Sequence, residues 1–177
     1  VAADKLLGSS SEVLEEDGRN IRRLIDELMR VLGTKFPVYV LVSKCDLVQG
    51  MTQFCEHLSD NVLDQAMGVV NRDTSGGVVA FGDRCIRTVG DRLRDLRLLL
   101  FHEAGSRGSA SAVEPSLFLF PEEFEKLDPG LKAFLRGAFQ ENPYQETPHL
   151  RGVFFSSGRQ EGSPYSHFLN ELGLIQQ

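Results

Sequence analysis

The sequence predicts an α/β fold in which a partial parallel sheet carries a mostly helical insertion or subdomain. Residues 38–42 read V-Y-V-L-V, a short apolar run of the kind found in strands buried on both faces of a parallel sheet. Residues 150–157, L-R-G-V-F-F-S-S, predict the last core strand. Between these strands, apolar residues recur at three- and four-residue spacing, which favours helices.

The first segment, residues 1–50, is expected to form the α/β core. Val1–Ala3 resembles the end of a strand, and Ser9–Ser11 offer N-caps for a long helix that Gly33 would end. Strand, helix and strand in this order imply a right-handed parallel crossover. The predicted apolar face of the helix comprises Leu14, Ile21, Leu24, Ile25, Leu28 and Leu32.

The second segment, residues 51–147, is expected to be mostly helical. A long helix is predicted over residues 82–102, and its alternating charges indicate a solvated face, with an interaction surface as the alternative. Residues 105–116 are rich in Gly, Ser and Ala, which predicts a linker. The third segment, residues 148–177, is expected to supply the last core strand and a closing helix.

Within the helical segment, two further predictions concern residues 117–139. Leu117–Phe120 is interpreted as a short buried strand, and Pro121 suits the first position of a following helix. Asp128–Gly130 should kink or split that helix. Five of the twelve phenylalanines are expected in the core, namely Phe118, Phe120, Phe124, Phe134 and Phe139.

Composition limits the class of protein. With 177 residues, 41% hydrophobic, the chain can bury a sizeable core, and a net charge of −6 argues against a general nucleic-acid binder. Three cysteines without a C-x-x-C pair predict neither a disulfide framework nor a zinc site. No apolar run reaches the roughly 18 residues that cross a bilayer. Because the chain starts at Val1 without methionine, we expect a piece of a longer protein.

A polar quartet, Ser43-Lys44-Cys45-Asp46, follows the first apolar strand directly. Ligands of open α/β sheets bind beyond the carboxyl ends of strands. The quartet resembles the base-recognition motif of P-loop GTPases, in which a carboxylate accepts two hydrogen bonds from one edge of guanine. By this resemblance Asp46 would bind the base, the Lys44 stem would lie along the base plane, and Ser43 would connect neighbouring loops. The alternative is that Asp46 caps the following turn and Lys44 is simply exposed.

A second pair of polar residues, Ser156 and Ser157, ends the other predicted core strand. In the P-loop GTPase fold the corresponding turn offers a backbone N–H to the base oxygen. These serines are therefore further candidate nucleotide-binding residues, with an ordinary strand-to-loop turn as the alternative. Parallel strands would place the two polar ends at one edge of the sheet.

The catalytic half of a nucleotide site is missing from the sequence. A P-loop requires G-x-x-x-x-G-K-[ST], and the chain contains no Gly-Lys dipeptide. We therefore assign no catalytic residue and no metal ligand. Phosphate and magnesium contacts supply much of the affinity in such enzymes. Residues 1–177 are expected neither to hydrolyse GTP nor to bind it with micromolar affinity, and GTP or ATP with Mg²⁺ is expected only in a full-length protein.

Three stretches resemble the IcmF/TssM family of type VI secretion proteins: residues 36–47, F-P-V-Y-V-L-V-S-K-C-D-L, residues 118–124, F-L-F-P-E-E-F, and residues 150–162, L-R-G-V-F-F-S-S-G-R-Q-E-G. The resemblance implies the C-terminal portion of a cytoplasmic, P-loop-NTPase-like domain. It also implies a place on the cytoplasmic face of the bacterial inner membrane, with membrane contact only through segments outside this chain.

The resemblance further implies partners and leaves three functions open. The implied partners are an inner-membrane subunit, an outer-membrane lipoprotein and cytoplasmic baseplate components. The chain would be a scaffold and interaction domain of the secretion complex, or the base-binding half of a working GTPase that powers or switches secretion. An unrelated adaptor with a GTPase-like half-sheet is the third possibility.

Overall fold

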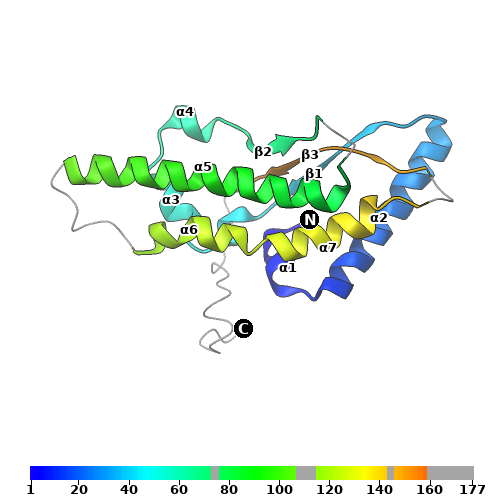
Figure 1. Cartoon of the computed structure of the whole chain (residues 1–177), viewed down its shortest axis with the longest axis horizontal. Helices are drawn as coiled ribbons and strands as arrows, with labels where there is room; N and C mark the ends of the chain where they lie inside the picture. The colour runs from blue at the N-terminus through cyan, green and yellow to red at the C-terminus, as the bar shows by residue number, and fades with distance from the viewer. Residues whose placement is uncertain (73–75, 107–114, 143–145, 159–177) are drawn as a thin grey trace.

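The computed structural model describes residues 1–72, 76–106, 115–142 and 146–158 (Figure 1). The predicted closing helix and most of the predicted linker lie outside these residues. The described helices are α1 (Ala3–Gly8), α2 (Ser11–Leu32), η1 (Cys45–Leu47), α3 (Met51–Glu56), α4 (Asp60–Leu63), α5 (Val78–Ser106), α6 (Pro115–Glu125) and α7 (Asp128–Phe139). The described strands are β1 (Pro37–Val42), β2 (Met67–Val70) and β3 (His149–Phe155).

The described strands form a mixed sheet in the order β1-β3-β2. β1 and β3 are parallel, as expected for the two core strands. β2 pairs with β3 in the antiparallel sense, and it was missed because M-G-V-V is too short and carries a glycine. The sheet is therefore not purely parallel. Its kinship to P-loop NTPases stays a prediction.

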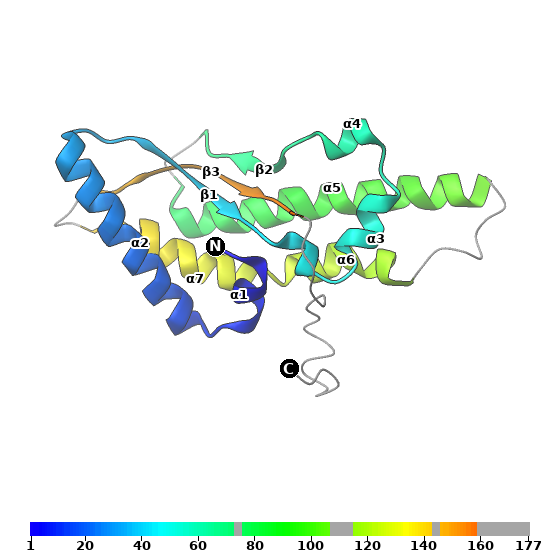
Figure 2. The same ribbon diagram turned by 180° about the vertical axis from the view of Figure 1, so that it is seen from behind.

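Helices cover one face of the sheet (Figures 1 and 2). The side chains of Val40 and Val42 are buried on that face, whereas Tyr39 and Leu41 on the other face are 54% and 53% exposed. The prediction that this strand is buried on both faces is thus wrong for the described chain. Alternation along the strand places every second side chain on the open face.

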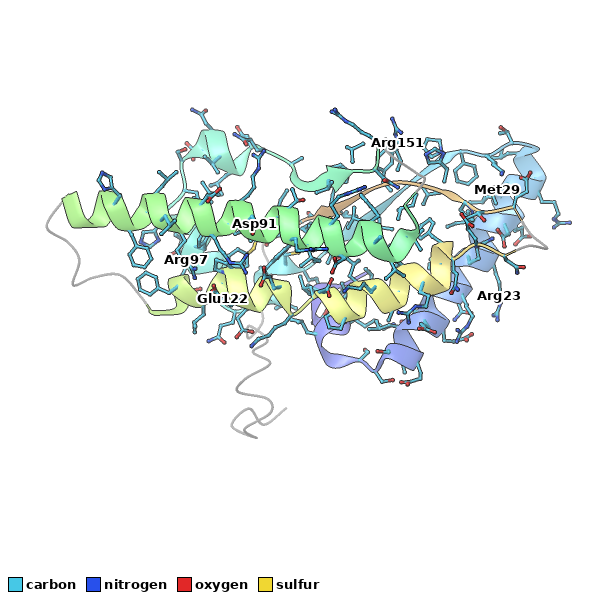
Figure 3. All side chains as sticks on the ribbon, in the orientation of Figure 1. Arg23, Met29, Asp91, Arg97, Glu122 and Arg151 are labelled. Carbon is cyan, nitrogen blue, oxygen red and sulfur yellow. The ribbon has the colours of Figure 1, made fainter. Side chains whose placement is uncertain are left out.

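Helix α2 has the predicted bounds but a different buried face. The Ser10 hydroxyl accepts a hydrogen bond from the Val13 N–H at its start, and Gly33, with φ 65°, ends it. Its buried residues are Leu14, Gly18, Arg22, Ile25 and Met29, the last of which is labelled in Figure 3. Four members of the predicted face are exposed instead, namely Ile21, Leu24, Leu28 and Leu32.

Glycine decides which face of α2 is buried. A Cβ on Gly18 would lie 2.8 Å from the backbone nitrogen of Ala138 and closer still to the Phe134 carbonyl oxygen. Gly137 on α7 makes an equally close approach to the α2 backbone at Glu15. The two helices therefore pack backbone to backbone. A hydrophobic pattern does not reveal this, because glycine carries no apolar side chain.

The segment predicted as a strand at residues 117–120 belongs to helix α6 instead. Phe120, Phe124 and Leu127 recur at four- and three-residue spacing, and all are buried. The Phe120 ring contacts Phe54 at 5.2 Å between centroids, and Phe124 contacts Phe155 at 4.8 Å. Helical packing on the sheet therefore prevails over the local strand pattern. The predicted split near Asp128 is confirmed, since α6 ends at Glu125 and α7 begins at Asp128.

Candidate functional site

The ends of β1 and β3 lie side by side, which brings the two predicted polar segments together. The Ser156 N–H donates to the Val42 carbonyl oxygen at 2.8 Å. The Cys45 N–H in turn donates to the Ser156 carbonyl oxygen at 3.1 Å. The parallel pairing therefore continues past the ends of β1 and β3. It holds the quartet Ser43-Lys44-Cys45-Asp46 beside Ser156 and Ser157.

Asp46 and Ser157 are joined directly. The Ser157 hydroxyl donates a hydrogen bond of 3.0 Å to Asp46 Oδ1. Asp46 is half-buried and Ser157 is exposed. The carboxylate is thus oriented by a residue 111 positions away in the sequence. A carboxylate has about four lone-pair positions, so this one bond leaves it able to accept more.

Lys44 and Ser43 have constrained backbones. Lys44 has φ 59°, and among the described residues no other non-glycine has a positive φ. This left-handed conformation costs a non-glycine residue of order 1 kcal/mol, and such residues cluster at functional sites. The Ser43 N–H donates to the Val1 carbonyl oxygen at 2.9 Å, and the Ser43 carbonyl oxygen accepts from the Ala3 N–H at 2.8 Å. Ser43 therefore connects the N-terminal residues to the end of β1. The sequence carried no signal for the Lys44 conformation.

Cys45, between these residues, is a buried packing residue. Its side chain is fully buried, and the Sγ lies 3.4 Å from the Val42 carbonyl oxygen. Burial raises the pKa of the Cys45 thiol to about 12. A thiol that stays protonated at neutral pH is a poor nucleophile. We therefore interpret Cys45 as a packing residue and expect it to be a poor nucleophile.

Other chemistry is not assembled in the described part of the chain. His57 Nδ1 lies 2.8 Å from the Gln53 carbonyl oxygen of its own helix. No group of three or more His, Cys, Asp or Glu side chains could hold a metal ion within those residues. Open hollows of about 390 and 510 Å³ lie along α2, and neither is lined by Asp46 or Ser157. The polar corner, defined as Ser43, Lys44, Asp46, Ser156 and Ser157, lies at the edge of the sheet and is partly exposed.

The fold and this corner define a mixed α/β domain whose parallel core strands end in a hydrogen-bonded polar edge. Comparison with known families gives a narrower class. The chain belongs to the IcmF-related family, because residues 1–176 match the family model described as the IcmF-related N-terminal domain. That description does not support the expected placement in the C-terminal portion of an NTPase-like domain.

A curated relative extends the comparison. The type VI secretion system component TssM1 of Pseudomonas aeruginosa is 34% identical over 174 residues. The match covers 96% of this chain but 15% of TssM1. No solved structure matches the chain significantly. Among the helices of the described residues, none combines the length and apolarity needed to span a membrane.

Proposed function

We propose that this chain is a scaffold and interaction domain of a type VI secretion complex. Membership of the IcmF-related family and the likeness to TssM1 support a place in such a system. We further propose that it lies on the cytoplasmic face of the bacterial inner membrane. Its partners there would be the inner-membrane partner subunit and cytoplasmic baseplate components.

The observation that carries the scaffold role is a group of exposed apolar side chains, called the α5–α6 patch, towards the C-terminal end of α5 and on α6. Leu98 and Leu99 are 64% and 60% exposed, and Leu119 and Phe101 are also exposed. Phe101 stacks on Phe118 of α6, with 4.3 Å between ring centroids. Residues 98–101 are apolar on successive positions, so they cover most of the circumference of the helix. A helical turn with apolar side chains on all sides is normally buried.

A paired substitution tests the scaffold role in the full-length protein. Leu98→Glu with Leu99→Glu should abolish secretion and the co-purification of the partner subunits. Protein level and melting temperature should stay unchanged, because both leucines are already exposed. Leu63→Glu on α4, another exposed leucine, is the matched control. Normal secretion by the double variant would contradict the proposed patch.

A second candidate function, binding of a nucleotide base, is favoured by the hydrogen bond between Ser157 and Asp46. A carboxylate held in this way can accept two parallel hydrogen bonds from guanine. Adenine presents one donor and one acceptor, and such a mismatch costs about 1–3 kcal/mol. Lys44 and Ser43 would support the base, and Ser157 would contribute from the β3 turn, because the Ser156 N–H already donates to the Val42 carbonyl oxygen. Phosphates and Mg²⁺ would need residues outside this chain.

The base-binding candidate has its own test in the full-length protein. Asp46→Asn replaces one acceptor by a donor, which suits xanthine better than guanine. The substitution should therefore weaken GTP binding at least tenfold and strengthen binding of xanthosine triphosphate. Equal binding of both nucleotides by both proteins would contradict base reading. If no P-loop precedes this chain, Asp46→Ala should change secretion little.

A further inference from the structure

The outer edge of β1 is unpaired along most of its length within the described residues. β3 occupies one edge. On the other edge, Ala2 forms a parallel bridge with Ser43, just beyond the strand. Unpaired strand edges are normally covered or blunted by charges and bulges. The run V-Y-V-L-V has no charge, and Pro37 and the register shift between Val38 and Tyr39 lie at its start, so residues 39–42 are not protected in that way.

The N-terminal residues already follow the ladder of a parallel strand. The Val1 nitrogen donates to the Leu41 carbonyl oxygen at 3.0 Å, and the Ser43 N–H donates to the Val1 carbonyl oxygen at 2.9 Å. The Ala3 N–H then donates to the Ser43 carbonyl oxygen at 2.8 Å. These bonds alternate between the two segments as in a regular parallel pair. They fix the register: Ala2 lies opposite Ser43, so the residue directly before Val1 would lie opposite Leu41.

The chain between Val1–Ala2 and β1 also has the length and the helix expected of a connection between two parallel strands. Parallel neighbours require a crossover of a dozen or more residues, usually a helix. Helix α2 lies between Ala2 and β1 in sequence and packs on α7. A strand ending at Val1–Ala2, α2 and β1 would therefore make a complete strand–helix–strand unit.

The exposed face of β1 is apolar as well. Tyr39 and Leu41 project from it, and the Tyr39 ring lies 6.0 Å from that of Phe154 on β3. Figure 2 views the sheet from the side opposite to α5. A strand buried on both faces explains the unbroken apolar run, whereas a half-exposed strand would alternate with polar residues. The sequence thus indicates a covering element that the described residues do not supply.

We propose that the free edge and open face of β1 are the docking site for the polypeptide that directly precedes Val1 in a longer protein. That segment adds a strand parallel to β1, and the polypeptide leading into that strand packs on the open face over Tyr39 and Leu41. Its second residue before Val1 accepts a hydrogen bond from the Leu41 N–H, and its fourth accepts one from the Tyr39 N–H. The existence of this segment is part of the proposal, and most of TssM1 lies outside the 15% that this chain matches. The proposal does not depend on nucleotide binding or on the α5–α6 patch.

Disulfide trapping in the full-length protein tests the docking and its register together. A cysteine at the residue directly before Val1 and Leu41→Cys would lie opposite each other on neighbouring strands. Their Cα atoms would be about 4.8 Å apart, within the range of a disulfide. Mild oxidation should give an intramolecular disulfide in most molecules. The matched control moves the first cysteine back by one residue, which turns its side chain to the other face and should lower the yield at least tenfold.

Maleimide labelling of the single variants Tyr39→Cys and Leu41→Cys supplies a second readout. Both should label at least tenfold more slowly than Arg87→Cys, whose side chain is 70% exposed on α5. A disulfide between two molecules would overturn the proposal in favour of a second copy of this chain. Slow labelling of Tyr39→Cys and Leu41→Cys without a disulfide would overturn the proposal in favour of another partner. Fast labelling of both would overturn it by showing that the face is open.

Discussion

The two faces of β1 carry similar side chains in different surroundings. Val40 and Val42 are buried beneath the helical layer, whereas Tyr39 and Leu41 are half-exposed. Helix α2 repeats the contrast, since Ile25 and Met29 are buried but Leu24 and Leu28 are exposed. The contrast between these buried and exposed residues shows that a pattern of apolar residues marks the surfaces that need a packing partner. Backbone fit at Gly18 and Gly137 decides which of these surfaces the described residues cover.

The largest expected effect comes from filling the close contact between α2 and α7. Gly18→Ala places a methyl group against the backbone of Ala138, so the helices must separate. We expect the free energy of unfolding of residues 1–177 to fall by about 2 kcal/mol, since overpacking typically costs 1–3 kcal/mol. Urea denaturation measures this. Gly76→Ala is the control because nothing lies within 4 Å of its added Cβ, and equal effects would contradict the close approach.

The next effect separates the two faces of β1. Val42→Ala leaves a cavity on the covered face and should cost about 1–2 kcal/mol, whereas Leu41→Ala on the open face should cost less than about 0.5 kcal/mol. Both values apply to residues 1–177 and are obtained by thermal or urea unfolding. In the full-length protein, Leu41→Ala should become as costly as Val42→Ala. If Leu41→Ala costs little stability both in residues 1–177 and in the full-length protein, no segment covers the open face of β1.

Thiol reactivity sharpens the contrast between covered and open positions. Burial raises the pKa of the Cys45 and Cys85 thiols to about 12. At pH 8 roughly one such thiol in 10⁴ is ionised, so neither should react with iodoacetamide within an hour in the native protein. Half-buried Cys55 should label faster, and all three should label in urea. Mass spectrometry of the peptides reads out each site, and rapid native labelling of Cys45 would refute its burial.

The same thiols give a pH dependence of stability. Their folded pKa lies above the usual value of 9.0, so the folded state favours the protonated form. This contribution to stability is complete below pH 9 and is lost as pH rises towards 12. Alkaline unfolding between pH 9 and 11 should therefore be weaker in a Cys45→Ala, Cys85→Ala variant than in the native chain. Identical slopes of stability against pH would contradict the shifts.

The smallest effect is expected at the polar corner. Ser157→Ala removes an exposed hydrogen bond to Asp46, so the free energy of unfolding should change by less than about 0.5 kcal/mol. In the full-length protein the same substitution should still weaken guanine nucleotide binding if Asp46 binds the base. Calorimetry with GTP provides that measurement. A large loss of stability with unchanged binding would make the bond purely structural.

Much of the corner could be predicted from sequence. Two apolar runs that end in polar residues predict neighbouring strand ends, and Ser156 does pair with Val42. The bounds of α2 followed from the three serines at residues 9–11, of which Ser10 is the N-cap, and from Gly33, because caps and left-handed stops are local. The buried face of α2 and the helical state of Leu119–Phe120 could not be predicted, because they depend on contacts distant in sequence. The left-handed backbone of Lys44 also has no local signature.

Hydrogen exchange at single-residue resolution in the full-length protein compares the two edges of β1 most directly. The Val40 and Val42 amides belong to the edge that pairs with β3, and the Tyr39 and Leu41 amides belong to the outer edge. If the segment before Val1 pairs with β1, all four amides should exchange slowly, within about tenfold of one another. Protection of Val40 and Val42 with rapid exchange at Tyr39 and Leu41 would show an open edge and contradict the proposed docking.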